Sequence, residues 1–117
     1  MSNSAMEPEE ALLVWTTVSD KPAAETLAVQ LVESGLAACV HVFGQGKSFY
    51  RWQGEMQQES ESTLLIKTLS SHYDALENLI KKIHPYDLPE ILATPVVQGE
   101  SAYLDWIGQS TRQNNQK

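Results

Sequence analysis

Apolar and polar positions follow two different periods along this chain, and each change of period marks a predicted element. The run at 11–18, ALLVWTTV, is rich in β-branched and aromatic residues and predicts a strand. Apolar residues then recur at helical spacing between Pro22, which suits a first helical turn, and Gly35, which suits the position after a last turn. The chain is therefore expected to begin with a strand and a helix over 21–34.

Two long extended runs follow and predict a hairpin. Residues 37–43, AACVHVF, favour a strand, and the glycines in 44–46 predict a bulge or bend rather than an end, because strand-forming residues resume at 48–52. Gly54 then marks a turn, and 56–69 is a second long extended run. Two long strands joined by a tight turn form a hairpin.

A second helix and a last strand complete the pattern. Ser71 is the expected N-cap, an apolar stripe runs from Tyr73 to Ile83, and Pro85 ends the helix because proline disfavours helix in the residue before it. The run PEILATPVV, 89–97, predicts the last main strand, and a short helix starts at 101–107. The residues of that helix expected to face inward are Tyr103, Leu104 and Ile107.

The predicted order of elements is β-α-β-β-α-β followed by a short helix. Two helices separated by a hairpin are typical of the ferredoxin-like arrangement, an α+β fold with an antiparallel sheet and helices on one face. A chain of 117 residues with 42% hydrophobic residues fits one domain, placed at 11–110. Residues 1–10 and 111–117 are polar and are expected to be a disordered arm and a disordered tail.

The hairpin is longer than the first and last strands can pair along their lengths. Unpaired strand ends carry free N–H and C=O groups and invite another chain. Phe49, Tyr50 and Trp52 lie on this overhang, with Tyr50 and Trp52 on one face and Phe49 on the other. The pattern predicts a homo-oligomer built by strand pairing between subunits; the alternative is a twisted hairpin that curls over its own sheet.

Charge and composition exclude several classes of protein. The formal net charge is −7, so the chain lacks the basic footprint of a nucleic-acid binder and has no attraction to an anionic membrane. Cys39 is the one cysteine and cannot form an internal disulfide. No apolar run approaches the roughly 20 residues that cross a bilayer, and no secretory signal is visible. A cytoplasmic location is expected.

The stretch KKIHPYDLPEI, 81–91, holds the densest set of side chains that bind metals or move protons. His84 could ligate copper or zinc as a neutral imidazole, or it could cap the end of the second helix. Asp87 and Glu90 could work as an acid and a base, or they could cap turns and backbone amides. The segment is therefore either a site or a well-formed corner between a helix and a strand.

Two further groups of residues carry possible chemistry. Cys39 and His41 share a strand face and resemble half of a metal site, although the apolar surroundings of Cys39 favour a buried structural thiol. Glu55, Glu59 and Glu61 form a row that could gather a divalent cation or could be a solvated strand face. The chain has no GxSxG, CxxC or HExxH motif, so no enzyme and no catalytic residue is expected.

Five blocks stand out by their order and spacing: GLAACV (35–40), YRWQGE (50–55), LLIKT (64–68), HPYDLPEI (84–91) and YLDW (103–106). Together they resemble the CutA family, the divalent cation tolerance proteins. The resemblance implies a ferredoxin-like subunit, a tight homotrimer in which long strands of neighbouring subunits pair, and a similarity in architecture to the PII signalling trimers. It also implies a role in tolerance to copper and other divalent cations, with no defined catalytic reaction.

The resemblance also bears on metal ligands. Copper binding in bacterial members is attributed to a first-strand cysteine, whose position is Trp15 here, and to paired histidines, whose positions are Ile83 and His84 here. His84 is the one ligand that remains, so copper or another divalent cation would be held weakly unless subunits bring several ligands together.

Three functions follow from these expectations. The first is a metal-binding or metal-responsive homotrimer in divalent-cation tolerance, with His84 as its metal ligand. The second is a PII-like module that binds a small organic ligand in a cleft between subunits. The third is a structural trimeric scaffold. The residues expected to line the cleft between subunits are Tyr50, Trp52, Lys67, His84, Tyr86, Asp87 and Glu90.

Overall fold

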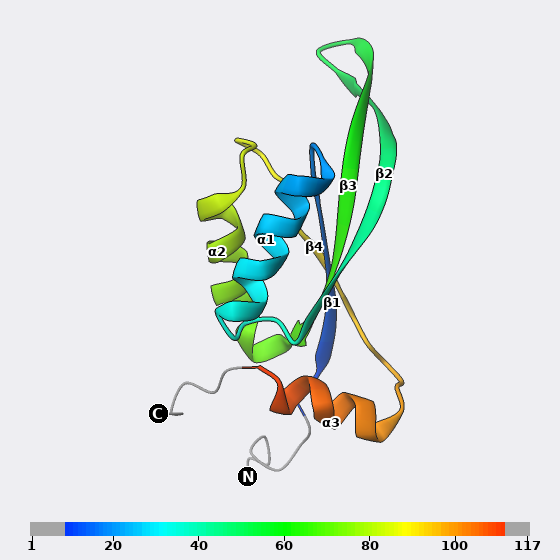
Figure 1. The fold of residues 1–117 in the computed structure, drawn as a ribbon. Coiled ribbons are helices and arrows are strands. Elements are labelled where there is room, and N and C mark those ends of the chain that lie inside the picture. The colour runs from blue at the N-terminus through cyan, green and yellow to red at the C-terminus, as the bar shows by residue number, and fades with distance from the viewer. Residues whose placement is uncertain (1–8, 112–117) are drawn as a thin grey trace.

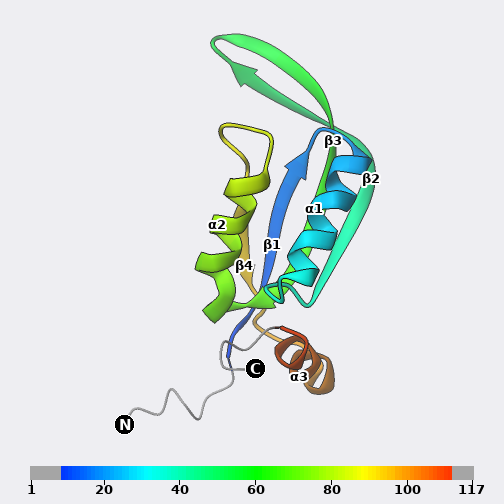
Figure 2. The same ribbon diagram turned by 60° about the vertical axis from the view of Figure 1, so that its left-hand side comes forward.

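The structure is a computed structural model that describes residues 9–111. Its elements follow the predicted order: β1 (Ala11–Val18), α1 (Lys21–Glu33), β2 (Cys39–Trp52), β3 (Glu55–Leu69), the short 3₁₀ helix η2 (Ser70–His72), α2 (Tyr73–Ile83), β4 (Leu92–Pro95) and α3 (Ser101–Gln109). The strands form one sheet in the order β2-β3-β1-β4, and all three pairings are antiparallel. Helices α1 and α2 lie side by side against one face of the sheet (Figures 1 and 2). The prediction of a ferredoxin-like α+β fold is confirmed.

The core lies between that face of the sheet and the two helices. Alternate residues of β1 and β3, such as Val14 and Ile66, are fully buried against Leu31 of α1 and Leu76 of α2. Burial of each such side chain contributes about 1.5–3 kcal/mol. A smaller cluster of Ala11, Leu69 and Ile107 seats α3 at one end of the sheet.

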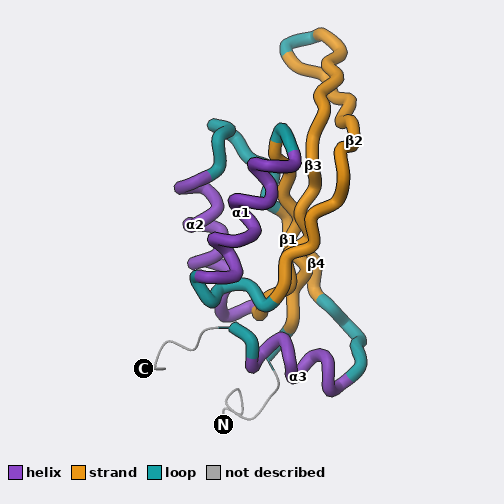
Figure 3. The backbone as a smooth tube through the Cα atoms, in the orientation of Figure 1, coloured by secondary structure: helices purple, strands orange, loops and turns teal. Residues whose placement is uncertain are grey.

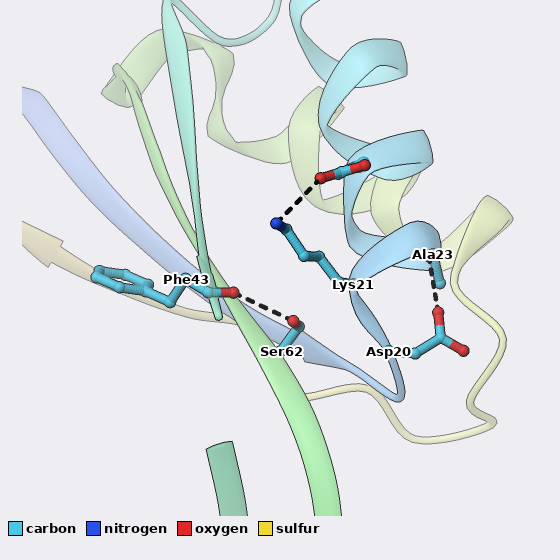
Figure 4. Close-up of polar contacts among 6 residues, drawn as sticks. Asp20, Lys21, Ala23, Phe43 and Ser62 are labelled. Atoms are coloured by element: carbon cyan, nitrogen blue, oxygen red, sulfur yellow. Dashed lines mark hydrogen bonds and ion pairs between the residues drawn. The ribbon is translucent and has the colours of Figure 1, made fainter. Parts of the chain in front are cut away.

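Helix α1 begins and ends as its sequence predicts. The Asp20 carboxylate accepts a 2.8 Å hydrogen bond from the backbone N–H of Ala23 (Figure 4), and Pro22 occupies the first turn. Gly35 follows the helix with φ of 82°, a left-handed conformation that glycine adopts without steric cost. Local signals alone therefore set both ends of this helix.

The start of α2 differs from the prediction that Ser71 caps it. The residue before the helix is His72, and no side chain caps that end. The backbone N–H of Ser71 instead donates to the Glu9 carboxylate at 2.9 Å, and the N–H of Ser70 donates to the Glu10 carbonyl at 2.8 Å. Residues that precede β1 therefore accept the hydrogen bonds at this end, where a local side-chain cap was expected.

Residues next to the predicted domain boundaries have defined contacts. Glu9 and Glu10, expected in the disordered arm, accept the hydrogen bonds from Ser71 and Ser70 of η2. Thr111, expected in the disordered tail, is buried and lies 3.0 Å from the His72 ring nitrogen. The rest of the predicted arm (1–8) and tail (112–117) lies outside the described residues.

The β2–β3 hairpin projects beyond the helices and the rest of the sheet (Figures 1 and 3). Pairing between β1 and β3 stops at Val18 and Ser62, so the part of β3 from Glu55 to Glu61 pairs with β2 alone. The predicted bulge is confirmed as a register shift between Val42 and Gln45. At this shift the Ser62 hydroxyl donates to the Phe43 carbonyl at 3.2 Å (Figure 4).

The last two elements, β4 and α3, differ in detail from the prediction. The predicted strand 89–97 is paired only over Leu92–Pro95, because β1 offers it Leu12–Trp15 as partners and the chain before Leu92 still belongs to the corner after α2. Tyr103, expected to face inward with Ile107, is 42% exposed. It turns towards Lys67 instead. None of the helices within residues 9–111 combines the length and apolar character needed to cross a bilayer.

Candidate functional site

The segment after α2 is a corner whose backbone closes the helix. His84 is the residue that follows the last helical turn, and its N–H donates to the Ile80 carbonyl at 2.8 Å. The prediction that His84 and Pro85 end the helix is confirmed. The corner then leads to β4 at the other edge of the sheet.

The His84 side chain points into the protein, with only 7% of the residue exposed. Its Nε2 lies 2.8 Å from the Thr17 carbonyl, and its Nδ1 accepts a 3.1 Å hydrogen bond from the N–H of Tyr86. A carbonyl oxygen only accepts, so Nε2 carries the proton and the ring is a neutral imidazole. Both ring nitrogens are thus occupied by backbone groups, and a metal ion at either one would have to displace a hydrogen bond.

Tyr86 joins this corner to the hairpin. Its hydroxyl donates to the Glu61 carboxylate at 2.9 Å, and the Ser48 hydroxyl donates to the other Glu61 oxygen at 2.6 Å. The Tyr86 ring also packs edge to face on the His84 ring, with centroids 4.8 Å apart. Burial, followed by the hydrogen bond to Glu61, raises the pKa of Tyr86 to about 12.

Glu61 is the residue of this network that the sequence did not single out. It appeared only as the last member of an acidic row with Glu55 and Glu59. Its two partners lie 13 and 25 positions away in the chain, so no local spacing identifies it. The sequence features closest to a signal for Glu61 were its two hydroxyl donors, Ser48 on one strand and Tyr86 in the corner.

The other predicted cleft residues divide into two places. Tyr50 and Trp52 are exposed on the overhang, and Asp87 and Glu90 are exposed in the corner without a hydrogen bond or ion pair to any residue in 9–111. Lys67 lies six residues further along β3 than Glu61, about 20 Å away. A single subunit therefore does not bring Lys67 to the corner.

Lys67 takes part in a separate cluster with α3. Its ammonium donates to the Tyr103 hydroxyl at 3.2 Å, and Tyr103 stacks on Trp106 with centroids 5.5 Å apart. The hydrogen bond to Tyr103 raises the pKa of Lys67, and partial burial opposes that rise. Cys39, which is paired with Lys67 across β2 and β3, is half-buried rather than enclosed.

The described residues do not form a copper site within one subunit. Residues 9–111 contain no group of three or more histidine, cysteine, aspartate or glutamate side chains placed to hold a metal ion. The family resemblance places metal ligands at two positions that Trp15 and Ile83 occupy here. Both residues are half-buried, and neither side chain offers an atom that ligates a metal ion. His41 is the exposed imidazole of the chain and contacts Phe43 edge to face at 4.7 Å.

These features define a ferredoxin-like subunit with a projecting hairpin and a hydrogen-bonded corner at the hairpin base. Comparison with known proteins agrees. The family described as CutA1 divalent ion tolerance protein matches residues 12–110. The chain is 43% identical over 103 residues to the divalent-cation tolerance protein CutA of Thermus thermophilus, covering 88% of this chain and 98% of that one. The CutA relative of Pectobacterium atrosepticum is also 43% identical, with 88% and 94% covered.

Solved structures show the same fold. The crystal structure of CutA1 from Oryza sativa superposes with a TM-score of 0.88 at 38% identity, covering 92% of this chain and 98% of that chain. The structure of the Thermus thermophilus protein gives a TM-score of 0.85 at 41% identity, with 87% and 99% covered. The chain belongs to the CutA1 divalent ion tolerance protein family, as the five sequence blocks indicated. None of these relatives carries an enzyme name.

Proposed function

We propose that this chain acts in divalent-cation tolerance as one subunit of a homotrimer, with its functional cleft between subunits. The observation that carries the proposal is an apolar row across the sheet face that α1 and α2 leave uncovered. Trp15 is paired with Leu65 on one side and Leu92 on the other, and Trp15 and Leu65 alternate with the core residues of β1 and β3. Leu92 is 60% exposed, and an open apolar face of this kind is typical of a surface that another chain covers.

The edges of the sheet support the same proposal. β2 and β4 are the two outer strands, and each has one side without a strand partner in the described chain. When the edge of β2 in one copy pairs with the edge of β4 in the next, each copy uses two different surfaces, and such a contact closes into a ring when three successive rotations between copies complete a turn. Assembly would then bring Lys67 of one subunit towards a corner of another, which a single subunit cannot do.

The mass in solution tests the assembly. Light scattering of the purified chain is expected to give about three times the 13.0 kDa of one chain. Leu92→Asp places a charge in the apolar row and is expected to dissociate the assembly. Val29→Asp is the matched control, since Val29 is 54% exposed on α1 and lies away from the row. A monomeric wild-type chain, or equal dissociation by both variants, would contradict the proposal.

For metal ions, we propose His84 as a copper ligand that becomes available only when the corner rearranges. The proposal rests on the imidazole of His84 in the corner, and the two backbone bonds to its ring predict weak binding. Copper titration should compare the wild type with His84→Gln, which keeps a donor for the Thr17 carbonyl, and with His41→Ala. Unchanged affinity in His84→Gln together with loss in His41→Ala would assign copper to the exposed imidazole instead.

A small organic ligand in the same cleft is the second candidate. The observation that favours it is the pairing of exposed aromatic residues, Tyr50 and Trp52, with a Tyr86 that is held in place by Glu61. A thermal-shift panel of anionic metabolites and nucleotides tests it, with Tyr86→Phe as the variant that should reduce any shift. If Tyr86→Phe and Glu90→Gln change only stability and assembly, the third candidate, a structural scaffold, is favoured.

A cytoplasmic location stays a prediction. The name of one relative, from Oryza sativa, places that protein in the chloroplast.

A further inference from the structure

A groove with a volume of about 1020 Å³ lies at the end of the molecule opposite the corner, between the last turn of α1 and helix α3. Figure 2 shows this end of α1 above α3. The exposed side chain of Val32 extends the apolar surface onto α1, with 45% of the residue accessible. The apolar residues in its lining are Ala11, Val32, Leu69, Val96 and Leu104.

Acidic side chains line the same groove. Glu9, Glu10, Glu33 and Asp105 all line the groove, and its lining contains no lysine, arginine or histidine among the described residues. Glu9 already accepts a hydrogen bond from the Ser71 N–H, which leaves the other three carboxylates to face a partner. All charged side chains in the described lining are therefore anionic.

Two helix ends add to this negative potential independently of the side chains. Glu33 is the last residue of α1 and Gln109 is the last residue of α3, and both line the groove. The C-terminal end of a helix carries a partial negative charge, which basic side chains in the last turn normally offset. Neither α1 nor α3 has a basic residue in its last turn. The groove thus concentrates negative potential over an apolar surface.

We propose that this groove docks a basic amphipathic segment of a partner protein. Apolar side chains of such a segment would cover Val32 and Leu104, and its lysine or arginine side chains would reach Glu33 and Asp105. Charge complementarity selects this occupant, because an anionic segment would meet three free carboxylates and two helix C-termini. A bare divalent cation fits less well, since the carboxylates do not converge into a metal-holding group within residues 9–111.

The test uses the full chain and two labelled peptides of equal length. One peptide carries leucine and lysine at helical spacing, and the other carries glutamate in place of lysine. Fluorescence anisotropy is expected to show binding of the lysine peptide only, with affinity that falls as salt rises. Glu33→Gln combined with Asp105→Asn is expected to weaken binding roughly fivefold, the loss that two exposed charge contacts produce.

Matched variants on α1 distinguish peptide binding in the groove from binding through the overall negative charge of the chain. Val32→Ser is expected to weaken binding, whereas Val29→Ser and Glu25→Gln, on the same helix but outside the groove lining, are expected to leave it unchanged. Equal losses in groove and control variants would overturn the proposal, because the peptide would then bind by overall charge. Binding only to a chain that ends at Thr111 would overturn it too, since the segment RQNNQK would then be the competitor for the groove.

Discussion

The Tyr86 hydroxyl donates a 2.9 Å hydrogen bond to Glu61 and thereby ties the corner after α2 to the base of the hairpin. Glu61 lies just beyond the last residue of β3 that pairs with β1, so the bond is made where the hairpin leaves the body of the sheet. Two long-range hydrogen bonds hold the corner, one from His84 to the Thr17 carbonyl and one from Tyr86 to Glu61. The position of the projecting hairpin therefore depends on a contact between two segments that are distant in sequence.

Removal of this hydroxyl tests its contribution to stability. Tyr86→Phe is expected to lower the free energy of unfolding by about 1–2 kcal/mol, because a half-buried carboxylate loses one of its two hydroxyl donors. Denaturant titration measures the change. Tyr103→Phe is the control and should cost less, since the Tyr103 hydroxyl accepts from Lys67 in a hydrogen bond that is exposed to solvent. Equal costs would contradict the argument.

Alkaline titration tests the environment of the same side chain. The pKa of Tyr86 is raised to about 12 in the folded chain, above the value of 10.0 for an ordinary tyrosine. The resulting stabilisation is fully present below pH 10.0 and is lost as the pH rises towards about 12. The difference in tyrosinate absorbance between the wild type and Tyr86→Phe should show this late ionisation.

Glu61→Gln tests the cause of the raised pKa of Tyr86. It removes the charged acceptor and the repulsion of tyrosinate, so the pKa of Tyr86 should fall, while burial, the larger cause, keeps it above the ordinary value. A Tyr86 that ionises at the same pH with and without the Glu61 carboxylate would contradict this assignment.

Two buried threonines with opposite surroundings form a matched pair. Thr16 and Thr68 are both fully buried, but the Thr68 hydroxyl donates to the Leu36 carbonyl at 2.6 Å whereas the Thr16 hydroxyl has no partner within the described residues. Replacement of Thr16 by valine is expected to raise the free energy of unfolding by about 1 kcal/mol, since an unpaired polar group is costly to bury.

Thr68→Val should lower the same free energy by about 1–2 kcal/mol, because it leaves the Leu36 carbonyl without its donor. Thermal or chemical unfolding of both variants measures the contrast. Equal signs for the two substitutions would show that packing, not hydrogen bonding, decides both positions.

The hairpin turn contains a residue in a conformation that glutamine disfavours. Gln53 has φ of 50° and Gly54 has φ of 82°, so both central residues of the turn are left-handed. Gln53→Asn is expected to stabilise the chain by about 0.5 kcal/mol, because asparagine adopts this conformation more readily. Gln57→Asn, in the extended part of β3, should not stabilise it. Chemical unfolding of both variants checks the difference, and a gain in both would argue against the turn as its source.

The order of elements was predictable from the sequence because its signals are local. Helical spacing and the flanking residues Asp20, Pro22 and Gly35 define α1, and Pro85 ends α2 as expected. The glycines near 44–46 correctly indicated a bulge that does not end the strand. The family blocks identified the fold for the same reason, since each block lies within one or two elements.

The sequence suggested candidate site residues but not their arrangement. His84, Tyr86 and the aromatic residues of the overhang were expected together with Lys67, but Lys67 lies with Tyr103 instead, and Glu61 was expected only in an acidic row with Glu55 and Glu59. The ring of His84 was considered as a metal ligand, and its two nitrogens are bound to backbone groups of Thr17 and Tyr86. Residue type suggested the chemistry, and the neighbours determined whether the lone pairs were free.

The sequence by itself determined the succession of strands and helices and the family, because periodicity and turns act over a few residues. Only the tertiary structure decided that Glu9 replaces the expected Ser71 cap, that Glu61 holds Tyr86, and that Trp15 lies in an uncovered apolar row. The hydrogen bonds between Glu9 and Ser71, between Glu61 and Tyr86 and between His84 and Thr17 join residues from 25 to 67 positions apart. They form only after the sheet has brought distant segments together, so no short-range pattern in the chain encodes them.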